Sequence, residues 1–161
     1  MLRKIKNARF NARHQRFAIV ASQYNGEYVE AMLAAALRVL KCAKAKDVQV
    51  VRVPGAYEIP VVARHFACSS GGRMSAVICL GVILRGETTH AQFIGEGVSR
   101  ALMNLQLEHG VPIIHEVLLL ESHDQARARC LDPKRNRGTE AAQTALAMAK
   151  VMEELDPPCP F

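Results

Sequence analysis

The sequence predicts an α/β fold in three layers: a four-stranded parallel β-sheet with helices on both faces. Short apolar runs rich in Val, Ile and Leu alternate with longer segments whose apolar residues recur at helical spacing. The run from Ala76 to Leu84 is apolar throughout, which is typical of a strand covered on both faces. Strands that alternate with helices favour parallel pairing through right-handed crossovers.

The first half of the chain holds two predicted strands and two predicted helices. Residues 16–22 (RFAIVAS) and 48–53 (VQVVRV) are short apolar runs that predict strands. Residues 26–43 repeat their apolar side chains at helical spacing. Residues 58–68 predict a helix with Pro60 in its first turn, where a missing N–H costs least.

The second half begins with a predicted strand over residues 75–84 and the longest predicted helix over residues 90–109. Thr89 and Gln92 have the spacing of a capping box, which predicts the start of this helix. Gly110 follows its last turn as a C-terminal glycine signal.

The last part of the chain predicts one more strand and two helices. Residues 111–119 (VPIIHEVLL) read as the fourth strand, and residues 122–130 as a short helix that starts at a Ser cap. A polar loop over residues 131–138 leads into the closing helix, residues 139–155, which is rich in Ala and Met.

A length of 161 residues suits one domain with its own core. We expect a basic N-terminal arm over residues 1–15, a single domain over residues 16–156 and a frayed tail over residues 157–161. The formal charge of +6 arises at the start of the chain, because residues 1–16 hold six basic residues and no acidic one. The other 15 basic residues balance 15 acidic ones, so nucleic-acid binding by the body is not expected. We interpret the arm as an assembly element, with a nucleic-acid contact as the alternative.

The cysteines and the hydropathy indicate the compartment. The five cysteines are scattered and contain no C-x-x-C pair, which argues against a disulfide framework and against a zinc site. No apolar stretch is long enough to predict a membrane span. We therefore expect a cytoplasmic protein without a membrane anchor or bound metal.

The loop between the third strand and the longest helix predicts an anion site. Free N–H groups at a helix start, together with the helix dipole, favour an anion such as phosphate. His90 would be the first residue of the helix, where the dipole favours a neutral imidazole that can exchange protons; an ordinary helix-end histidine is the alternative. Residues 81–88 differ from the phosphate-loop pattern G-x-x-x-x-G-K-[ST] only at Glu87, which would repel phosphates, so an NTPase is set aside.

Three motifs occur in order along the chain: P-G-A-Y-E-I-P (54–60), G-V-I-L-R-G-E-T-T-H (81–90) and N-R-G-x-E-A-A (136–142). Together with Q-Y-N at 23–25, they resemble the lumazine synthases, the family that acts at the penultimate step of riboflavin biosynthesis. The resemblance extends from about Arg16 to Leu155. It implies a flavodoxin-like subunit that assembles into homopentamers, with active sites between neighbouring subunits.

The resemblance also implies a transferase that needs neither a metal nor an organic cofactor. Its reaction joins 5-amino-6-(D-ribitylamino)uracil to 3,4-dihydroxy-2-butanone 4-phosphate, and it releases 6,7-dimethyl-8-ribityllumazine, inorganic phosphate and water. The loop 131–138 has no obvious insertion relative to capsid-forming members, which allows an icosahedral shell of 60 subunits. Pro133 and Arg135 stiffen and charge this loop, which favours pentamers or decamers instead. An association with riboflavin synthase is a further expectation.

Residue by residue, the resemblance assigns the pyrimidine and its ribityl chain to a defined set. Tyr24 matches the aromatic residue that stacks on the pyrimidine, usually Phe or Trp, and Glu58 can accept hydrogen bonds from the ribityl hydroxyls. His115 departs from the Phe that is usual in its strand and adds a titratable group. The whole set is Tyr24, Ala56, Tyr57, Glu58, Val82, Ile83, Leu84 and His115.

The second substrate and the chemistry are assigned to other positions. Glu87 and Thr88 match the loop that offers N–H groups to the phosphate of the butanone. Arg129 matches the arginine that pairs with this phosphate from the next subunit, a role that suits a guanidinium fork. His90 matches the proton donor and acceptor, and Arg137 stands where a Lys or Arg near the pyrimidine is common.

A non-catalytic carrier of flavin or lumazine with the same fold is the alternative function. His90 and Arg129 weigh against it, because a protein that only binds such ligands needs neither residue.

Overall fold

The computed structural model describes residues 10–68 and 73–155, and over these residues the predicted three-layer α/β fold is confirmed. The strands are β1 (Arg16–Ser22), β2 (Asp47–Val53), β3 (Ala76–Leu84) and β4 (Ile113–Leu120). The helices are α1 (Gly26–Cys42), α2 (Ile59–Cys68), α3 (His90–His109), α4 (His123–Ala126) and α5 (Arg137–Leu155). Two short turns add to them: the 3₁₀ turn η1 (Ala56–Glu58) and the π-helical turn η2 (Arg127–Leu131).

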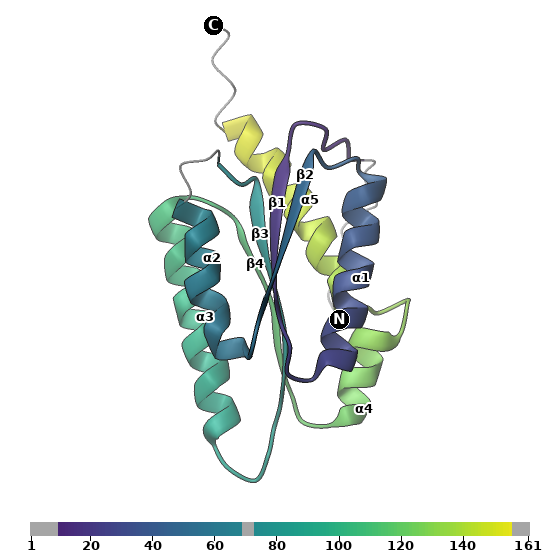
Figure 1. Cartoon of the computed structure of the whole chain (residues 1–161), viewed down its shortest axis with the longest axis vertical. Coiled ribbons are helices and arrows are strands. Elements are labelled where there is room, and N and C mark those ends of the chain that lie inside the picture. Colours follow the sequence, from purple (N-terminus) through teal and green to yellow (C-terminus); the bar gives the residue numbers. More distant parts are fainter. Residues whose placement is uncertain (1–9, 69–72, 156–161) are drawn as a thin grey trace, which may run out of the picture.

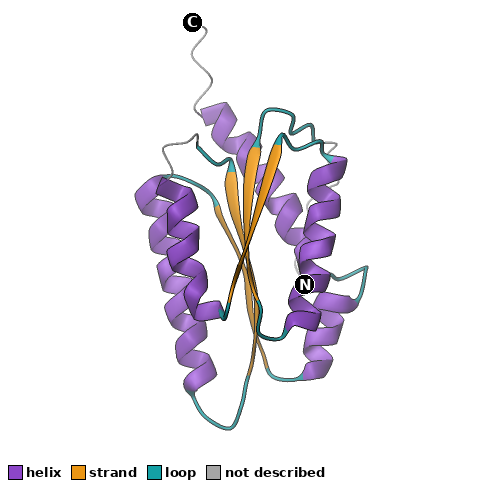
Figure 2. Cartoon of the chain, viewed as in Figure 1, coloured by secondary structure: helices purple, strands orange, loops and turns teal. Residues whose placement is uncertain are grey.

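The four strands pair in parallel in the order β2-β1-β3-β4. The helices α2 and α3 cover one face of the sheet, and α1, α4 and α5 lie on the other (Figure 1). Figure 2 shows the sheet as the middle layer between these two groups of helices. None of the helices formed by the described residues combines the length and apolar character needed to cross a bilayer.

Two cores, one on each face of the sheet, explain the uninterrupted apolar run of β3. Because successive side chains of a strand point to opposite faces, Ile78 and Leu80 join the core beneath α1 and α5. Val77 and Cys79 join the core beneath α2 and α3. Burial raises the pKa of the Cys79 thiol far above its usual range, so this cysteine is an apolar core residue.

Residues 10–15 pack against the body of the protein. Ala12 is fully buried, its N–H donates to Ala43 O at 2.8 Å, and its carbonyl accepts from Lys46 N at 3.2 Å. The packed body therefore includes residues that precede Arg16. Residues 1–9 of the expected arm and the expected tail 157–161 lie outside the described residues.

The helix ends test three sequence signals. Gly110 ends α3 in the left-handed region (φ 60°), and Ser122 Oγ accepts from Gln125 N at 3.3 Å, as their signals predict. The predicted capping box of Thr89 and Gln92 is wrong. The backbone of Thr89 is already helical (φ −74°, ψ −1°), so its side chain makes no capping bond, and Gln92 donates to Glu96 instead.

The short helix predicted over residues 122–130 is divided in the structure. A single turn, α4, is followed by the π-helical turn η2, which carries Arg129.

The N-R-G motif brings α5 against α1. A Cβ atom placed on Gly138 would lie 1.9 Å from the backbone oxygen of Met32. The two helices can therefore pack this closely only because residue 138 has no side chain. Asn136 secures this approach from both sides. Its Oδ1 accepts from Gly138 N at 2.9 Å, and its Nδ2 donates to Ala31 O at 3.4 Å and also to Cys130 O. The first and third residues of the motif therefore have structural roles.

Candidate active site

A pocket of about 790 Å³ lies at the carboxyl ends of β1, β2 and β3. The chain leaves β1 into α1 on one face of the sheet and leaves the neighbouring β3 into α3 on the other. Such a switch point between adjacent parallel strands is the usual ligand site of an open α/β sheet. The lining residues are Tyr24, Asn25, Gly55, Ala56, Tyr57, Glu58, Val82, Ile83, Leu84, Gly86, Thr88, His90, Ala91, Phe93, Ile94 and Gly97.

Hydrogen bonds tie the three loops of the pocket together. Tyr24 N donates to Pro54 O at 3.0 Å, and Asn25 Nδ2 donates to Val82 O at 2.8 Å. Asn25 adopts the left-handed conformation (φ 56°, ψ 40°), which asparagine tolerates better than most residues. The loop after β1 is therefore fixed to the loop after β2 and to the end of β3.

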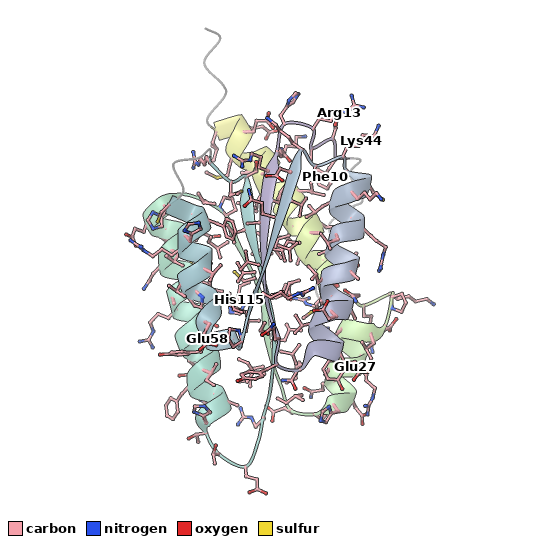
Figure 3. All side chains as sticks on the ribbon, in the orientation of Figure 1. Phe10, Arg13, Glu27, Lys44, Glu58 and His115 are labelled. Atoms are coloured by element: carbon pink, nitrogen blue, oxygen red, sulfur yellow. The ribbon has the colours of Figure 1, made fainter. Side chains whose placement is uncertain are left out.

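Tyr24 and Glu58 lie next to each other in the pocket. Gly55 N donates to Glu58 Oε2 at 2.9 Å, and a Cβ atom on Gly55 would lie 3.0 Å from the Tyr24 ring. The Tyr24 side chain is nevertheless 69% exposed, which leaves most of the ring open to a planar ligand. Figure 3 shows Glu58 toward the end of the molecule where the strands lead into these loops.

His90 is the first residue of α3 and lines the same pocket. Its backbone N–H donates to Thr88 Oγ1 at 3.4 Å, so the hydroxyl lies over the start of the helix. Gly86 and Thr88 also line the pocket, whereas the intervening Glu87 is exposed and is not part of the lining. The loop therefore brings a small residue, a hydroxyl and an imidazole to one wall.

Cations are absent from this wall. Among the described residues that line the pocket, Glu58 and His90 are the titratable groups besides tyrosines, and there is no Lys or Arg. The nearby Arg85 pairs with Glu121 at 3.0 Å. A phosphate in this pocket would have helix-start N–H groups but no guanidinium among the described lining residues.

Arg129 lies away from the pocket of its own subunit. It is exposed on η2, and it has no ionic partner within residues 10–68 and 73–155. Its neighbour Arg127 differs, because its guanidinium pairs with Asp124 at 2.6 Å. Arg129 is thus an accessible guanidinium that makes no ion pair with the described residues of its own subunit.

Arg137 is held by two carboxylates. Its Nε and Nη2 atoms donate to the two oxygens of Glu116, each at 3.0 Å, and its Nη1 pairs with Glu140 at 2.5 Å. Glu116 is buried on β4; burial raises the pKa of its carboxyl, and the guanidinium of Arg137 opposes that effect. The two-point geometry of the pair favours the ionised form of both groups.

Replacement of Glu116 by Gln is expected to lower the free energy of unfolding by about 2 kcal/mol. Breaking a fully buried pair costs about 3–5 kcal/mol, and the half-buried Arg137 keeps Glu140 as a partner, which reduces the loss. Urea unfolding measures this loss of free energy. Glu140→Gln is the matched control, because Glu140 is more exposed than Glu116 and its replacement should lower the free energy of unfolding less. Equal losses in the two variants would contradict this account of Glu116.

His115 also lies outside the pocket of its own subunit. It is on β4, the edge strand of the sheet, and its ring bonds to Ser99 on α3 and to the backbone of Val117. Burial of its ring lowers the pKa of His115. The structure therefore gathers Tyr24, residues 56–58 and 82–84, Thr88 and His90, and it leaves His115, Arg129, Arg137 and the Glu87 side chain elsewhere.

Sequence reasoning did not select several residues of the site. Asn25 and Phe93 line the pocket, and Ser99 contacts His115. The Asn-Gly pair at the end of β1 was a usable signal, because asparagine before glycine suits a left-handed position. No signal in the sequence pairs Ser99 with His115, since that contact depends on how α3 lies on β4.

The fold and the pocket define an open α/β protein that binds a small ligand at a switch point of a parallel sheet. Comparison with known proteins then identifies the family: the sequence profile described as 6,7-dimethyl-8-ribityllumazine synthase matches residues 14–153, and the chain belongs to that family. A protein of Syntrophus aciditrophicus named 6,7-dimethyl-8-ribityllumazine synthase is 37% identical over 153 residues, covering 94% of this chain and 98% of the relative. A protein of the same name from Salinibacter ruber is 39% identical over 143 residues, covering 88% and 90%.

Proposed function

We propose that this chain is a riboflavin-pathway transferase that joins 5-amino-6-(D-ribitylamino)uracil to 3,4-dihydroxy-2-butanone 4-phosphate to form 6,7-dimethyl-8-ribityllumazine. Family membership supports the reaction. The observation in the structure that carries the proposal is a pocket that combines an open aromatic ring, a carboxylate and an imidazole, provided by Tyr24, Glu58 and His90. These groups suit a flat heterocycle, a polyhydroxyl chain and a proton transfer, respectively.

In this proposal the pyrimidine stacks on Tyr24. Its ribityl hydroxyls donate to Glu58, whose Oε2 is already oriented by Gly55 N. Residues 82–84 at the end of β3 present backbone groups to the edge of the ring. Val82 O already accepts from Asn25 Nδ2. Leu84 directs its backbone groups to the same open edge of β3, whereas those of Ile83 point toward β4, so Leu84 has the freer backbone groups for that contact.

The phosphate of the second substrate requires a cation that the pocket of one subunit lacks. Arg129 is exposed and has no ionic partner in the part of the chain that the structure describes, but it belongs to a different part of the surface. We therefore propose that each active site lies between two subunits, with Arg129 of one subunit facing the loop 86–88 of its neighbour. His115 and Arg137 would reach the pyrimidine in the same way.

Exposed apolar side chains support assembly on the side of the sheet that carries α2 and α3. Tyr57, Val61, Phe93, Met103 and Leu107 are each more than half exposed, which is unusual for an isolated subunit. We propose a homopentamer in the cytoplasm, with residues 1–9 as an assembly arm and the 60-subunit shell as its larger form. Light scattering would give about 89 kDa for five chains of 17.7 kDa.

Catalysis in this site is proposed to come mainly from holding the two substrates together, with His90 moving protons. The amine of the pyrimidine attacks the ketone and forms an imine with loss of water, and phosphate is then eliminated to give an enol that tautomerises to a carbonyl. The second nitrogen attacks this carbonyl and closes the ring with loss of a second water. Two bound reactants react as if unimolecular, which accounts for a large part of the rate. An imidazole on the wall, at the first residue of α3, can take and return the protons of these steps.

His90→Ala is expected to lower kcat by about 100-fold, the low end of the effect of general acid–base catalysis, and to leave a measurable rate. The residual rate follows from the proximity effect, which the substitution does not remove. Steady-state kinetics with both substrates measure it, and His65→Ala, an exposed histidine on α2 outside the pocket, is the matched control. Full activity in the His90 variant would remove this residue from the mechanism.

The assay that tests the function follows the fluorescence of the lumazine and the release of phosphate in the same reaction. Product above the uncatalysed background supports the synthase. Tight binding of the pyrimidine without product would instead indicate a carrier of lumazine or flavin. A salt-sensitive gel shift that disappears on deletion of residues 1–9 would indicate a nucleic-acid contact by the arm.

A further inference from the structure

We propose that Ser99 is a positioning residue that locks His115 in one tautomer and one orientation, so that His115 offers only the face of its ring to the pyrimidine. The inference rests on the proposed function, in which His115 lines the site of a neighbouring subunit. It adds a residue, Ser99 on α3, that neither the sequence motifs nor the family comparison assigns. The ring on β4 would thereby act as an aromatic wall instead of a hydrogen-bonding group.

The first observation fixes Nδ1 of the imidazole. Val117 N donates to His115 Nδ1 at 3.1 Å. A ring nitrogen that accepts a hydrogen bond carries no proton, so the neutral ring must be protonated on Nε2. The bond also has a structural task, because β4 is an edge strand and the Val117 N–H would otherwise lack a partner. The equivalent N–H at Ile113 is covered in the same manner by Gln106 Oε1 at 3.0 Å.

The second observation concerns Nε2 and agrees with this assignment. Ser99 Oγ lies 2.7 Å from His115 Nε2 and 2.7 Å from Gly95 O. A ring protonated on Nε2 donates to Ser99 Oγ, and the hydroxyl then donates its own proton to Gly95 O. In this tautomer both ring nitrogens and the serine hydroxyl have hydrogen-bond partners.

The consequence is that both nitrogens of His115 are used within the subunit. Neither is left to bond to a ligand, although the residue is exposed at the surface. What a ligand can contact is the π-face of the ring, which suits stacking on a pyrimidine. Figure 3 marks His115 beside the sheet.

The charges around the ring agree with a neutral imidazole. The adjacent groove between α3 and β4 is lined by Arg85, Glu96 and Arg100, so cations and an anion both lie on that side. Glu116 follows in sequence but belongs to the opposite face, where it pairs with Arg137. Burial lowers the pKa of His115 and outweighs a backbone hydrogen bond of the same residue that raises it, so the neutral ring is favoured at neutral pH. As the pH falls, protonation would place a hydrogen on Nδ1 and break the bond from Val117 N.

A spectroscopic measurement tests the tautomer without any substrate. Solid-state ¹⁵N NMR of histidine-labelled protein, with the His115 signals assigned from His115→Phe, should show a neutral ring protonated on Nε2 at pH 7. A ring protonated on Nδ1, or an imidazolium, would overturn the proposal.

Kinetics then test the positioning role. Ser99→Ala should raise the pyrimidine KM about tenfold, which corresponds to the loss of one good hydrogen bond, and should leave kcat and the KM of the butanone phosphate close to those of the wild type. Ser99→Thr keeps the hydroxyl and should restore the pyrimidine KM. In the His115→Phe background, Ser99→Ala should have no further effect, because Phe makes no bond to Ser99.

An equal effect of Ser99→Ala in both backgrounds would show that Ser99 acts on α3 alone and would overturn the proposal. Wild-type protein that forms no product would refute the proposed function, and with it the role of His115 as a wall for the pyrimidine. The ¹⁵N spectrum would then still decide the tautomer, so the two failures are distinguishable.

Discussion

Arg129→Ala is expected to raise the KM for 3,4-dihydroxy-2-butanone 4-phosphate by about 10- to 100-fold. The reason is that the pocket has no other guanidinium or ammonium group among its described lining residues, and a hydrogen bond to a charged group contributes about 1.5–3 kcal/mol. The pyrimidine KM should change little, because Tyr24, Glu58 and the end of β3 are untouched. Initial-rate measurements in which each substrate is varied in turn give both constants.

The neighbouring Arg127 supplies the control for this prediction. It lies on the same turn, η2, but its guanidinium is already paired with Asp124, so Arg127→Ala should leave both KM values nearly unchanged. Arg129→Lys should recover part of the affinity, since it keeps the charge and loses the planar fork. An equal rise of both KM values in Arg129→Ala would contradict a phosphate-specific role.

Gly138→Ala is expected to destabilise the fold by more than about 4 kcal/mol, a loss found only for severe steric or packing defects. The added methyl group would lie 1.9 Å from Met32 O and 2.5 Å from the carbonyl carbon, and both atoms belong to the backbone of α1. Relief requires α5 to move away from α1, which opens the core that Ala141, Ala142 and Ala145 fill. Thermal unfolding followed by circular dichroism should show a Tm lower by about 10 °C or more.

The same substitution at Gly26 is the control. A Cβ atom there meets nothing within 4 Å, and Gly26 is the first residue of the partner helix α1. Gly26→Ala should be neutral or should stabilise by up to about 1 kcal/mol, because it restricts the unfolded chain. A Tm for Gly138→Ala within the error of the wild type would show that α1 and α5 do not approach as closely as the structure has them.

Most of the fold could be predicted from the sequence because strands and long helices leave a local pattern. Apolar residues recur at the spacing that places them on the buried faces of a strand or on the one buried face of a helix. Strand β1 and helix α3 have the predicted bounds, and the uninterrupted apolar run of β3 correctly indicated burial on both faces. The capping box at Thr89 failed because spacing alone does not give the backbone conformation of the cap residue.

The edge strand β4 contains side chains whose contacts could not be predicted from the local sequence. His115 and Glu116 are adjacent polar residues in an apolar run, and the strand period places them on opposite faces. Their partners, Ser99 and Arg137, lie 16 and 21 residues away, and only the packing of α3 and α5 on the sheet brings them together. The part of the candidate site built from strand ends was therefore predictable, whereas the contacts that hold His115 and Arg137 were not.

The residues assigned by the family resemblance fall into two groups, those in the pocket and those outside it, and the order of the strands explains this division. The motifs at 54–60 and 81–90 follow neighbouring strands and meet in one pocket. Arg129 follows β4, at the edge of the sheet, and its helical turn directs it to another surface. Residues that the family resemblance assigns to one active site therefore need not lie close together within one subunit.

The hydrogen bonds that join the loops after β1, β2 and β3 have a consequence for ligand binding. Because Gln23, Tyr24 and Asn25 are bonded to Val53, Pro54 and Val82 of the same subunit, these loops need no contact with a ligand to hold this shape. The apparent affinity for a ligand is then not reduced by a low population of the binding-competent conformation. Binding of the pyrimidine should therefore follow a single bimolecular step in stopped-flow measurements, with an observed rate that rises linearly with ligand concentration and no slow isomerisation after it.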